Sequence, residues 1–584
     1  MLVLGINAYG HDPAVAALVD GELRFFLEEE RCLRVKHATG ALPVRALAEA
    51  FRHLKLGAGD AGAIGYPFDT KRYVRHRVLR HGLFALRPTA FWKTAAVSVK
   101  RSGLGRDLAS ATGCGRLPVT RFLDHQLCHA ASAFFCSPFD DAAALTVDGA
   151  GEDATIAIHR CEGTRVTTIG RVVYPASLGA VYSSIALHLG FGGGSPEGKL
   201  MGLAAYGEPT MLPRFRELVA MPREGELLVD LRAFAYPGMR RGVGPALARE
   251  LGPARGPGEP LLDRHKDIAA SVQARLEEVM VAFARHALAR CGSKNLCLAG
   301  GVALNSVANR KVLDESGCAG LFVMPASHDA GAAIGAAFLL ACERGPLRRP
   351  EGGLGRAAFG ALWDAADVER FLEEAGVPST RTHDLPAAVA DDVAKGLVVG
   401  FHNGRDEAGP RALGSRSLFA DPRRPEMRDH LNRKVKGRED FRPLAPMLRE
   451  EDVPAYFVDP VPSPFMLLTA RANDLGREKI PAALHVDGTA RLQTVNRHHA
   501  PLHHRILGEV GLRTGVPVMI NTSFNVRGEP LVHSPADAYR CFLGTAIDAL
   551  YLGPFRIAAG THLPALRDGS PGRARGGTYR TLDQ

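Results

Sequence analysis

The stretch Leu145-Thr146-Val147-Asp148-Gly149-Ala150-Gly151-Glu152-Asp153 joins a short apolar segment to a glycine-rich acidic loop. Two further apolar segments follow, Ala154–His159 and Arg165–Ile169, with the turn residues Glu162-Gly163 between them. Short apolar runs bounded by Gly and Asp are typical of β-strands. The same order of strand, polar loop, strand, turn and strand occurs in residues 2–28. The sequence therefore predicts a duplicated α/β unit made of two related lobes.

Two histidines lie four residues apart in the stretch Asp124-His125-Gln126-Leu127-Cys128-His129. Asp124 can cap a helix start, and on that helix His125 and His129 share one face. Taken alone, such a pair is more often a surface or core feature than a metal site. Two aspartates that follow short apolar strands, Asp148 and Asp329, favour the metal. Two imidazoles and two carboxylates suit iron, manganese or zinc.

The composition is typical of a soluble globular protein, and the length of 584 residues predicts two domains. No apolar run approaches the ~20 residues of a membrane helix, and residues 1–6 have no basic leader, so they are expected to form a buried strand. The ten cysteines include no CxxC pair, which indicates reduced thiols and a cytoplasmic location. The net charge of +10 suits anionic substrates and leaves nucleic acid to be considered.

The densest basic run spans Lys71 to Arg106, and it includes interleaved aromatic residues such as Tyr73 and Trp92. This pattern fits a nucleic-acid surface, but a solvated helical face or a lid over an anionic substrate is favoured. The segments 60–110 and 222–260 are the least regular parts of the first half, and they are expected to determine acceptor specificity.

Helical periodicity is found in residues 174–190 and 266–290. A strand at Asn295–Leu298 then runs into Gly300-Gly301 and a helix, which would present backbone N–H groups to a nucleotide or phosphate. A Gly-Gly pair by itself can equally allow a strand and a helix to pack tightly. The two duplicated loops, residues 7–12 and 148–153, could face each other and hold phosphates from either side.

A Gly- and Pro-rich segment, residues 343–358, is interpreted as an interdomain linker. The predicted organisation is a first domain over residues 1–345, a linker over 346–358, a second α/β domain over 359–567 and a flexible tail over 568–584. The second domain is expected to begin with the helix Pro386–Lys395 and the strand Leu397–Phe401.

The second half of the chain carries many basic residues, several beside Gly or Pro. An arginine in a tight turn commonly orients phosphate or carboxylate. Anion binding is therefore favoured over structural pairing with Glu407, Glu439 and Asp440. The basic residues in question are Arg405, Arg411, Arg416, Lys434, Lys436, Arg438, Arg442, Arg491, Arg497 and Arg527.

A set of motifs spread along the chain resembles those of the O-carbamoyltransferases of antibiotic biosynthesis and nodulation. The resemblance covers nearly the whole chain, and its most specific parts are Glu197-Gly198-Lys199 and Gly409-Pro410-Arg411-Ala412-Leu413-Gly414. The other matching segments are His11-Asp12, Glu28–Arg31 with Arg34 and Lys36-His37, Asp124–His129, Ala299–Asn305, Arg438–Pro446, Asp487–Val495 and Asn521–Asn525.

This resemblance implies an ASKHA-type (actin-like/hexokinase-like) N-terminal domain and a YrdC-like C-terminal domain. It also implies a reaction in two steps. ATP with Mg²⁺ and carbamoyl phosphate give carbamoyl-adenylate in the YrdC-like domain, and a hydroxyl of a natural product or sugar then takes the carbamoyl group in the metal-bearing domain. Among the metals, the resemblance favours Fe²⁺, with Zn²⁺ or Mn²⁺ as alternatives.

The resemblance also suggests roles for individual residues. His125, His129, Asp148 and Asp329 would hold the metal. His11 or Asp12 would act as the base, and Lys36 would contact an anion. Gly149, Glu197, Lys199, Gly300, Gly301 and Asn305 would bind the adenylate. Carbamoyl phosphate and ATP would be bound by Arg411, Arg416, Lys436, Arg438, Arg442, Arg491, Asn521, Ser523 and Arg527.

Two other functions fit parts of the sequence. A small-molecule kinase would share the fold but gives no reason for the histidine pair or for the basic second half. An RNA-binding or tRNA-modifying protein would use the basic run 71–106, although a nucleic-acid partner is not favoured. A membrane partner is not expected, and a homodimer is expected only because symmetric dimers are the commonest assembly.

Overall fold

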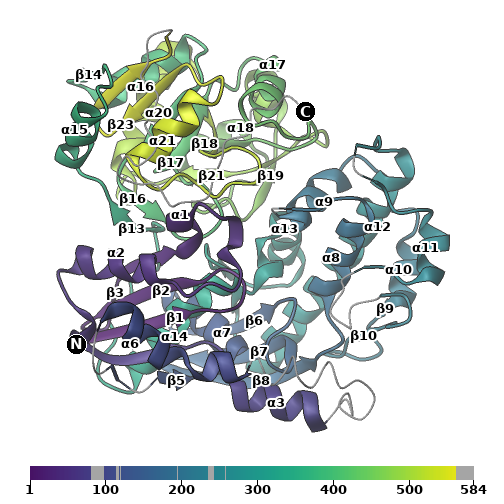
Figure 1. Ribbon diagram of the computed structural model, residues 1–584. Coiled ribbons are helices and arrows are strands. Elements are labelled where there is room, and N and C mark those ends of the chain that lie inside the picture. Colours follow the sequence, from purple (N-terminus) through teal and green to yellow (C-terminus); the bar gives the residue numbers. More distant parts are fainter. Residues whose placement is uncertain are drawn as a thin grey trace. The chain divides into compact units, whose positions relative to one another are not determined.

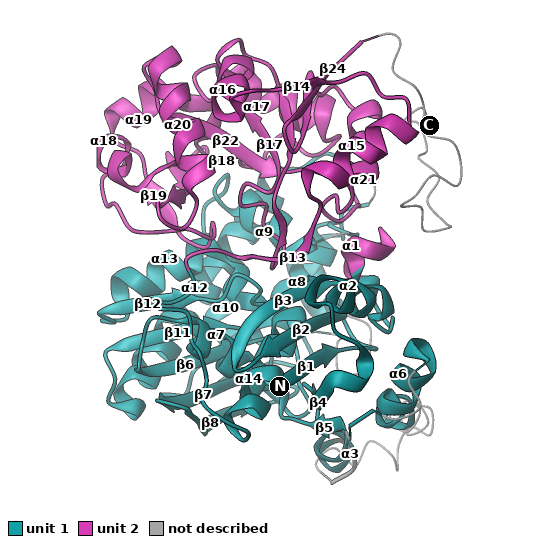
Figure 2. Ribbon diagram, turned by 90° about the vertical axis from the view of Figure 1, so that its left-hand side faces the viewer, with its two compact units in different colours: residues 1–29, 38–354 teal, residues 30–37, 355–584 magenta. Residues whose placement is uncertain are grey.

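The computed structural model describes residues 1–79, 98–113, 117–118, 120–193, 195–234, 242–256 and 258–560. The chain divides into two compact units, residues 1–29 with 38–354 and residues 30–37 with 355 onward (Figure 2). The break at 354/355 lies inside the predicted linker. Residues 30–37 group with unit 2, although the predicted boundaries assigned them to the first domain. The predicted tail 568–584 and residues 80–97 of the basic run lie outside the described residues.

The first sheet of unit 1 has the strand order β3-β2-β1-β4-β5. Its first three strands form an antiparallel meander, and β4 and β5 continue it in parallel with β1. The turn at Asp20-Gly21 has φ values of 50° and 80°, which is the mirror-image turn that matches the twist of a hairpin. The strands are β1 Leu2–Asn7, β2 Ala14–Val19, β3 Glu22–Glu28, β4 Ala61–Tyr66 and β5 Thr120–Phe122.

The second sheet of unit 1 repeats this topology with the order β12-β11-β6-β7-β8. Again three strands form an antiparallel meander, and two parallel strands extend it on the side of the first strand. The prediction of two related lobes is confirmed. The strands are β6 Asp141–Val147, β7 Ala154–Glu162, β8 Arg165–Val173, β11 Asn295–Ala299 and β12 Gly320–Val323.

Two helices rich in small residues pack against each other between the two sheets (Figure 1). Helix α14 (Asp329–Cys342) lies on β1, β2 and β4, and α7 (His125–Cys136) lies on β6, β7 and β11. The approach is close, because a Cβ added at Gly335 would lie 1.8 Å from the carbonyl oxygen of Cys128. This contact sets the positions of both helix N-termini.

The long helix α12 (Asp263–Cys291) covers the other face of the second sheet and also packs against α8, α9, α10 and α13. The helix predicted over 174–190 begins later than expected, since Ser177 caps its first turn by accepting from the N–H of Ala180. The remaining helices of unit 1 are α2 Val44–Leu54, α3 Thr70–Leu79, α6 Leu104–Thr112, α8 Leu178–His188, α9 Pro196–Ala204, α10 Leu212–Leu218, α11 Pro245–Leu251 and α13 Ser306–Glu315.

Unit 2 is built on a mixed sheet with the order β14-β24-β23-β15-β17-β22-β18-β21. Its strands are β14 Thr380–Arg381, β15 Val399–His402, β17 Arg416–Ala420, β18 Ala445–Arg449, β21 Gln493–Val495, β22 Val518–Ser523, β23 Ala549–Leu552 and β24 Phe555–Ala558. Two small sheets accompany it, formed by β13 Ala358–Leu362 with β16 Arg405–Glu407 and by β19 Thr469–Arg471 with β20 Thr489–Arg491.

Each face of this sheet carries its own apolar core, because successive side chains of a strand point to opposite faces. On β17, Leu418 packs with residues of α15 (Ala365–Glu374) and α21 (Pro535–Leu543), whereas Phe419 packs with α16 (Leu385–Ala394) and α20 (Pro501–Thr514). The helix predicted over 386–395 therefore exists, shifted by one residue. The short helices are α1 Glu29–Leu33, α17 Glu426–Asp429, α18 Val453–Tyr456 and α19 Asp474–Lys479.

Among the described residues, no helix has both the length and the apolar character required to cross a membrane.

Candidate functional site

Four side chains from three elements of unit 1 converge on one point. His125 and His129 come from the first turns of α7, Asp148 directly follows β6, and Asp329 lies in the first turn of α14. Nε2 of His125 lies 3.1 Å from Oδ2 of Asp148 and 3.1 Å from Nε2 of His129. Oδ1 of Asp329 lies 3.6 Å and 3.9 Å from the same two nitrogens.

Neighbouring groups hold these donors in a fixed orientation. Nδ1 of His125 lies 3.1 Å from the carbonyl oxygen of Pro67, so Nε2 faces the other donors. Oδ1 of Asp148 accepts from the backbone N–H groups of Gly149 (2.7 Å) and Gly301 (3.3 Å), which leaves Oδ2 directed at the histidines. Gly300, with φ of 88°, has no room for a Cβ beside Val147. The Gly-Gly segment thus brings one backbone donor, the N–H of Gly301, to Asp148.

The N-terminus of α7 contacts a partly buried network of charged side chains that the sequence analysis did not identify. Asp124 caps the helix as predicted, accepting from Leu127 at 2.8 Å, and Glu152 accepts from the N–H of His125 at 3.1 Å. Arg72 reaches Asp124 (2.8 Å) and Asp153 (2.7 Å), and Arg171 reaches Asp124 at 3.0 Å. The acidic pair 152–153 beside the glycine loop was the one sequence signal for this network.

Burial and neighbouring charges shift the pKa values of His125 and Asp329. Burial lowers the pKa of His125, but the hydrogen bond to Asp148 and the charges of Asp329 and Asp148 outweigh it and raise this pKa to about 10. Burial and the charge of Asp148 raise the pKa of Asp329 above its usual value. Without a metal ion, His125 thus holds a proton that a divalent cation would replace.

The donor set fits a divalent metal ion. All four ligand atoms lie within 4.8 Å of one another. For metal–ligand bonds of about 2.0–2.2 Å, neighbouring ligand atoms are expected about 3–3.6 Å apart, which is close to the separations of 3.1–3.9 Å found here. Two neutral imidazoles and two carboxylates would give iron, zinc or manganese a set of donors without net excess charge.

The proposed catalytic residues do not all belong to this cluster. Asp12 is 8% exposed, and its charge contributes to the raised pKa of Asp329, which places it near the cluster. His11 lies in the same loop, with Nδ1 at 3.4 Å from Oγ1 of Thr39. Lys36 belongs to the segment that groups with unit 2, where its Nζ lies 2.8 Å from Glu30.

The residues expected to bind the adenylate lie in two groups. Gly149, Gly300 and Gly301 surround Asp148, as described above. Asn305 caps α13 and bonds to Gln273 at 2.9 Å, so its amide is engaged within the protein. Lys199, on α9, is 8% exposed and donates weakly to the carbonyl of Gly192 at 3.4 Å, and Glu197 accepts from Ser183.

In unit 2 the structure gathers four of the predicted arginines, namely Arg411, Arg438, Arg442 and Arg491. Burial and then the charge of Arg442 lower the pKa of Arg411 to about 10 and that of Arg438 to about 9. Burial and the charges of Arg411, Arg442 and Arg438 lower the pKa of Arg491 as well. Buried like charges destabilise one another unless an anion neutralises them, so this cluster suits a polyanion.

The other predicted anion ligands of unit 2 are engaged within the protein. Arg416 is fully buried, with Nε 2.9 Å from Asp406. Lys436 donates to Oγ of Ser523 at 3.0 Å and to Oδ1 of Asn525 at 3.0 Å. Asn521 bonds to Gln493 at 2.7 Å. Arg527 is 62% exposed and lies 3.6 Å from Glu439. Side chains such as Arg416 and Asn521 thus support the loops around the arginine cluster.

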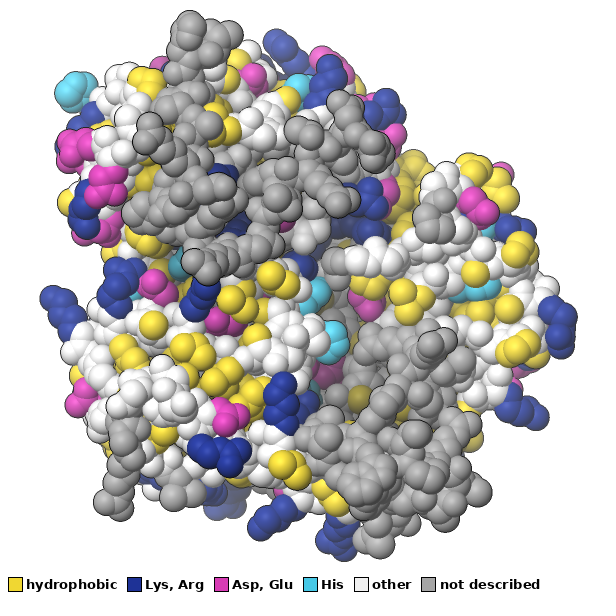
Figure 3. Space-filling model, viewed as in Figure 1, with side chains coloured by type: hydrophobic (Ala, Val, Ile, Leu, Met, Phe, Trp, Pro, Cys, Tyr) yellow, Lys and Arg dark blue, Asp and Glu magenta, His cyan; other side chains and the backbone are white. Residues whose placement is uncertain are grey.

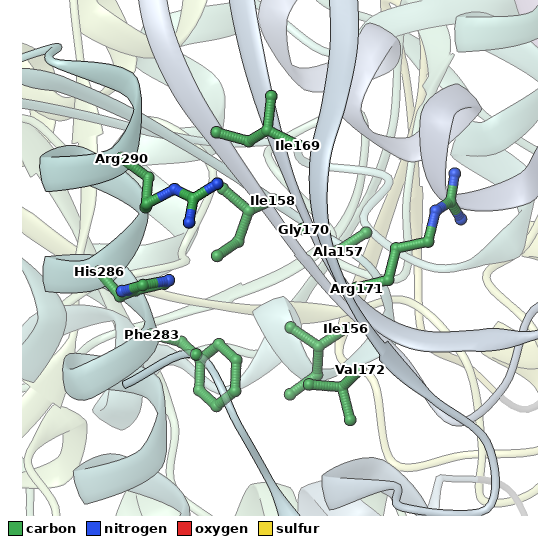
Figure 4. Close-up of a pocket in the computed structure, with 11 residues that line it drawn as sticks. Ile156, Ala157, Ile158, Ile169, Gly170, Arg171, Val172, Phe283, His286 and Arg290 are labelled. Atoms are coloured by element: carbon green, nitrogen blue, oxygen red, sulfur yellow. The ribbon is translucent and has the colours of Figure 1, made fainter. Parts of the chain in front are cut away.

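A cavity of about 40 Å³ lies elsewhere in unit 1, between β7, β8 and α12. Its lining includes Ile156, Ile158, Phe283 and His286, and Figure 4 shows the guanidinium of Arg171 pointing away from it. Because Arg171 pairs instead with Asp124 beneath α7, the cavity and the four-donor cluster lie on different faces of the second sheet. It is too small for an adenylate or a sugar.

The described part of the basic run is largely engaged within unit 1. Arg72 pairs with Asp124 and Asp153. Arg101 lies 3.6 Å from the ring centroid of Phe68, and Lys100 lies over the ring of Tyr9. In the view of Figure 3, the described Lys and Arg side chains occur in small groups separated by neutral and acidic ones. These observations do not favour a nucleic-acid surface.

Comparisons with known proteins identify the family. Residues 88–338 match the family model of the carbamoyltransferase N-terminus, and residues 390–559 match that of the carbamoyltransferase C-terminus. Nodulation protein NolNO of Sinorhizobium fredii is 35% identical over 96% of this chain and 80% of its own length. Nodulation protein NolO of Bradyrhizobium diazoefficiens is 38% identical over 74% of this chain and 78% of its own length.

Solved structures are only distantly similar. A ROK hexokinase from Thermus thermophilus has a TM-score of 0.28 and 18% identity over 59% of this chain and 100% of its own. HypF of T. kodakarensis has a TM-score of 0.30 and 15% identity over 59% of this chain and 47% of its own. Likeness at this level supports no conclusion about function. The family models and the relatives do, and by them the chain belongs to the carbamoyltransferase family of enzymes.

Proposed function

We propose that this carbamoyltransferase is an ATP-dependent O-carbamoyltransferase that works in two steps, one in each unit. Unit 2, which the motif resemblance assigns as YrdC-like, would form carbamoyl-adenylate from carbamoyl phosphate and ATP. Unit 1 would then transfer the carbamoyl group to a hydroxyl of a natural product or sugar. The observation that carries this proposal is the convergence of His125, His129, Asp148 and Asp329 in unit 1.

The first step would use the arginine cluster of unit 2. Carbamoyl phosphate and ATP are both polyanions, and guanidinium groups bind phosphate oxygens in pairs. Arg411, Arg438, Arg442 and Arg491 are destabilised by one another, so binding phosphates would relieve that repulsion. Adenylation gives the carbamoyl group a better leaving group than a carbamate has.

The second step would use the four-donor cluster of unit 1. A divalent metal ion held there, with Fe²⁺ favoured by the family resemblance, would supply Lewis-acid charge to offset the charge that develops as AMP leaves. Gly149 and Gly301 keep Asp148 oriented toward the cluster. A hydroxyl needs a base, and Asp12 is the favoured candidate, because its charge acts on Asp329 in the cluster.

The test separates the two half-reactions. Arg411→Ala should abolish the formation of carbamoyl-adenylate, with its release of phosphate and pyrophosphate, from ATP and carbamoyl phosphate. His129→Ala should leave adenylate formation intact and abolish transfer to a candidate alcohol, followed by mass spectrometry. Arg433→Ala, at a 62% exposed arginine of unit 2, serves as the control and should retain both steps.

Loss of the same half-reaction in both variants would refute the division of labour. Formation of ADP instead of AMP would indicate a kinase. Tight RNA binding that weakens steeply with salt would indicate a nucleic-acid protein.

A further inference from the structure

One cysteine of unit 2 lies beside a histidine that is itself bound to a buried carboxylate. Sγ of Cys32 is 3.9 Å from Nε2 of His533, and Nδ1 of His533 is 2.8 Å from Oδ2 of Asp406. Cys32 comes from the segment 30–37, Asp406 from β16 and His533 from the loop before α21. This is the arrangement of an activated thiol, in which a nucleophile lies beside a base and a third group orients that base.

The orientation of His533 is determined by its surroundings. Its carbonyl oxygen lies 2.9 Å from Nε2 of His402, and the ring of Trp363 stands nearly edge-on to its imidazole, with centroids 6.0 Å apart and an angle of 77°. Asp406 and His533 are 0% and 6% exposed, so solvent does not compete for their hydrogen bond. The imidazole is therefore held with Nε2 toward the sulfur.

The charges around the three groups favour a thiolate and an imidazolium. Burial acts against ionisation of Asp406, but Arg416 and His533 outweigh it and hold its pKa well below the usual range. Burial alone would lower the pKa of His533, and the charges of Asp406 and Cys32 raise it well above its usual value instead. Arg31 and Arg34, which flank Cys32, add positive charge, and the carboxylates that face Arg34 are Glu529 and Asp537.

Most other cysteines among the described residues have different surroundings. They are buried among apolar groups, where burial raises the thiol pKa and suppresses reactivity. These are Cys128, Cys136, Cys161, Cys297 and Cys541. Cys318 is partly exposed like Cys32 and so provides an internal comparison.

We propose that Cys32, His533 and Asp406 form a nucleophilic thiolate site that takes small soft electrophiles, with hydrogen peroxide and haloacetamides as examples. With iodoacetamide, Sγ of Cys32 would form an S–C bond as iodide leaves. With hydrogen peroxide, Sγ attacks one oxygen and the O–O bond breaks. The departing hydroxide takes a proton from the imidazolium of His533, which gives a sulfenic acid and water. The proposal does not depend on the function proposed above.

The test is the rate of alkylation of the native full-length protein by iodoacetamide between pH 5.5 and 9, resolved by peptide mass mapping. Cys32 should react at least about tenfold faster than Cys318 at pH 6.5, with a rate profile that rises at or below pH ~7, as for other thiolates stabilised by a histidine. His533→Gln should remove this advantage. A Cys32 profile that rises only near pH ~8.5, the value for an unperturbed thiol, would overturn the proposal.

Hydrogen peroxide provides a second measurement. Treatment at neutral pH followed by dimedone should label Cys32, and Cys32→Ser should lose that label while any labelling at other cysteines persists. Absence of a dimedone adduct on Cys32 under conditions that oxidise Cys318 would also contradict the proposal. Because the pH profile needs only the unmodified protein, a folding defect in His533→Gln would not prevent a decision.

Discussion

At the scale of single residues, Asp148 uses its two carboxylate oxygens differently. Oδ1 accepts from Gly149 and Gly301, whereas Oδ2 lies 3.1 Å from His125. Asp148→Asn keeps the shape but removes the charge that a metal requires. We expect divalent-metal affinity to fall by at least about a hundredfold, as measured by titration calorimetry with Zn²⁺.

The control for this prediction is Asp140→Asn, at a fully exposed aspartate of the same unit, which should bind Zn²⁺ as the unmodified protein does. Equal affinity in both variants would show that the four donors do not form the metal site. The prediction follows from the structure, because the sequence suggested Asp148 as a ligand but did not show which of its oxygens is already bound to the backbone.

At the scale of elements, α7 and α14 carry three of the four donors, and their contact depends on glycine. A Cβ at Gly335 would lie 1.8 Å from the carbonyl oxygen of Cys128. Gly335→Ala should therefore separate the helices and destabilise the protein by at least ~1–3 kcal/mol, the usual cost of overpacking. It should also weaken metal binding. Thermal unfolding and Zn²⁺ titration would measure both effects.

A helical glycine with more space gives the matched control. The nearest atom to a Cβ at Gly508, in α20, is a side-chain nitrogen of Arg449 at 3.7 Å. Gly508→Ala should stabilise the protein by ~0.5–1 kcal/mol, since alanine has the better helix propensity. Similar destabilisation by both substitutions would indicate that helix packing is not the cause.

The four consecutive charged side chains of the segment Glu28-Glu29-Glu30-Arg31 each bind a different partner. Glu28 pairs with His328 at 3.4 Å, and Glu29 accepts from the N–H of Ala46, at the start of α2, at 2.7 Å. Glu30 pairs with Lys36, and Arg31 donates to the carbonyl of Gly409 at 2.6 Å. The first two contacts belong to unit 1 and the others to unit 2, so this segment connects the two units along the chain.

Arg31 is 1% exposed and supports the backbone two residues before Arg411. If unit 2 binds carbamoyl phosphate, Arg31→Met should raise the KM for carbamoyl phosphate, measured by pyrophosphate release, about ten- to a hundredfold. The reason is that loss of the Arg31 contact would displace the side chain of Arg411, and a displaced binding group loses most of its effect. Arg24→Met, at an exposed arginine, should have no effect. A fall in kcat with unchanged KM would contradict this role.

At the scale of the whole molecule, each unit contains a histidine that is buried in its neutral form. Burial lowers the pKa of His159 in unit 1 and of His402 in unit 2 to about 3. The unfolded chain, with a pKa near 6.5 for each, binds more protons than the folded one between pH ~3 and ~6.5. The contribution of these two histidines to stability should therefore be complete above pH ~6.5 and be lost as the pH drops through this window.

The slope of this decline should approach ~1.4 kcal/mol per pH unit for each histidine at mid-window. Melting temperatures between pH 4.5 and 7.5 would measure it. His159→Gln should flatten the dependence, and stability that stays constant over this range would contradict the prediction. The glutamine keeps a hydrogen-bonding group beside Thr168, whose Oγ1 lies 3.0 Å from Nδ1 of His159.

The sequence by itself determined the order of local elements. The pattern of strand, acidic glycine loop and strand at residues 2–28 and 144–170 is local, so both lobes and the cap at Asp124 were predictable from it. The spacing of His125 and His129 is likewise a property of one helix. The motifs also indicated the carbamoyltransferase family, which the family models confirmed.

Only the tertiary structure decided which side chains meet. Arg411 and Arg416 are close in sequence and were predicted to act alike, yet Arg416 is neutralised by Asp406 while Arg411 lies among other arginines. Asp329 joins His125 because two glycine-containing helices pack closely, and Cys32 meets His533 across some five hundred residues of chain. Such contacts depend on how elements that are distant in the sequence pack together. The hydrophobic periodicity and the spacing of motifs along the sequence do not predict that packing.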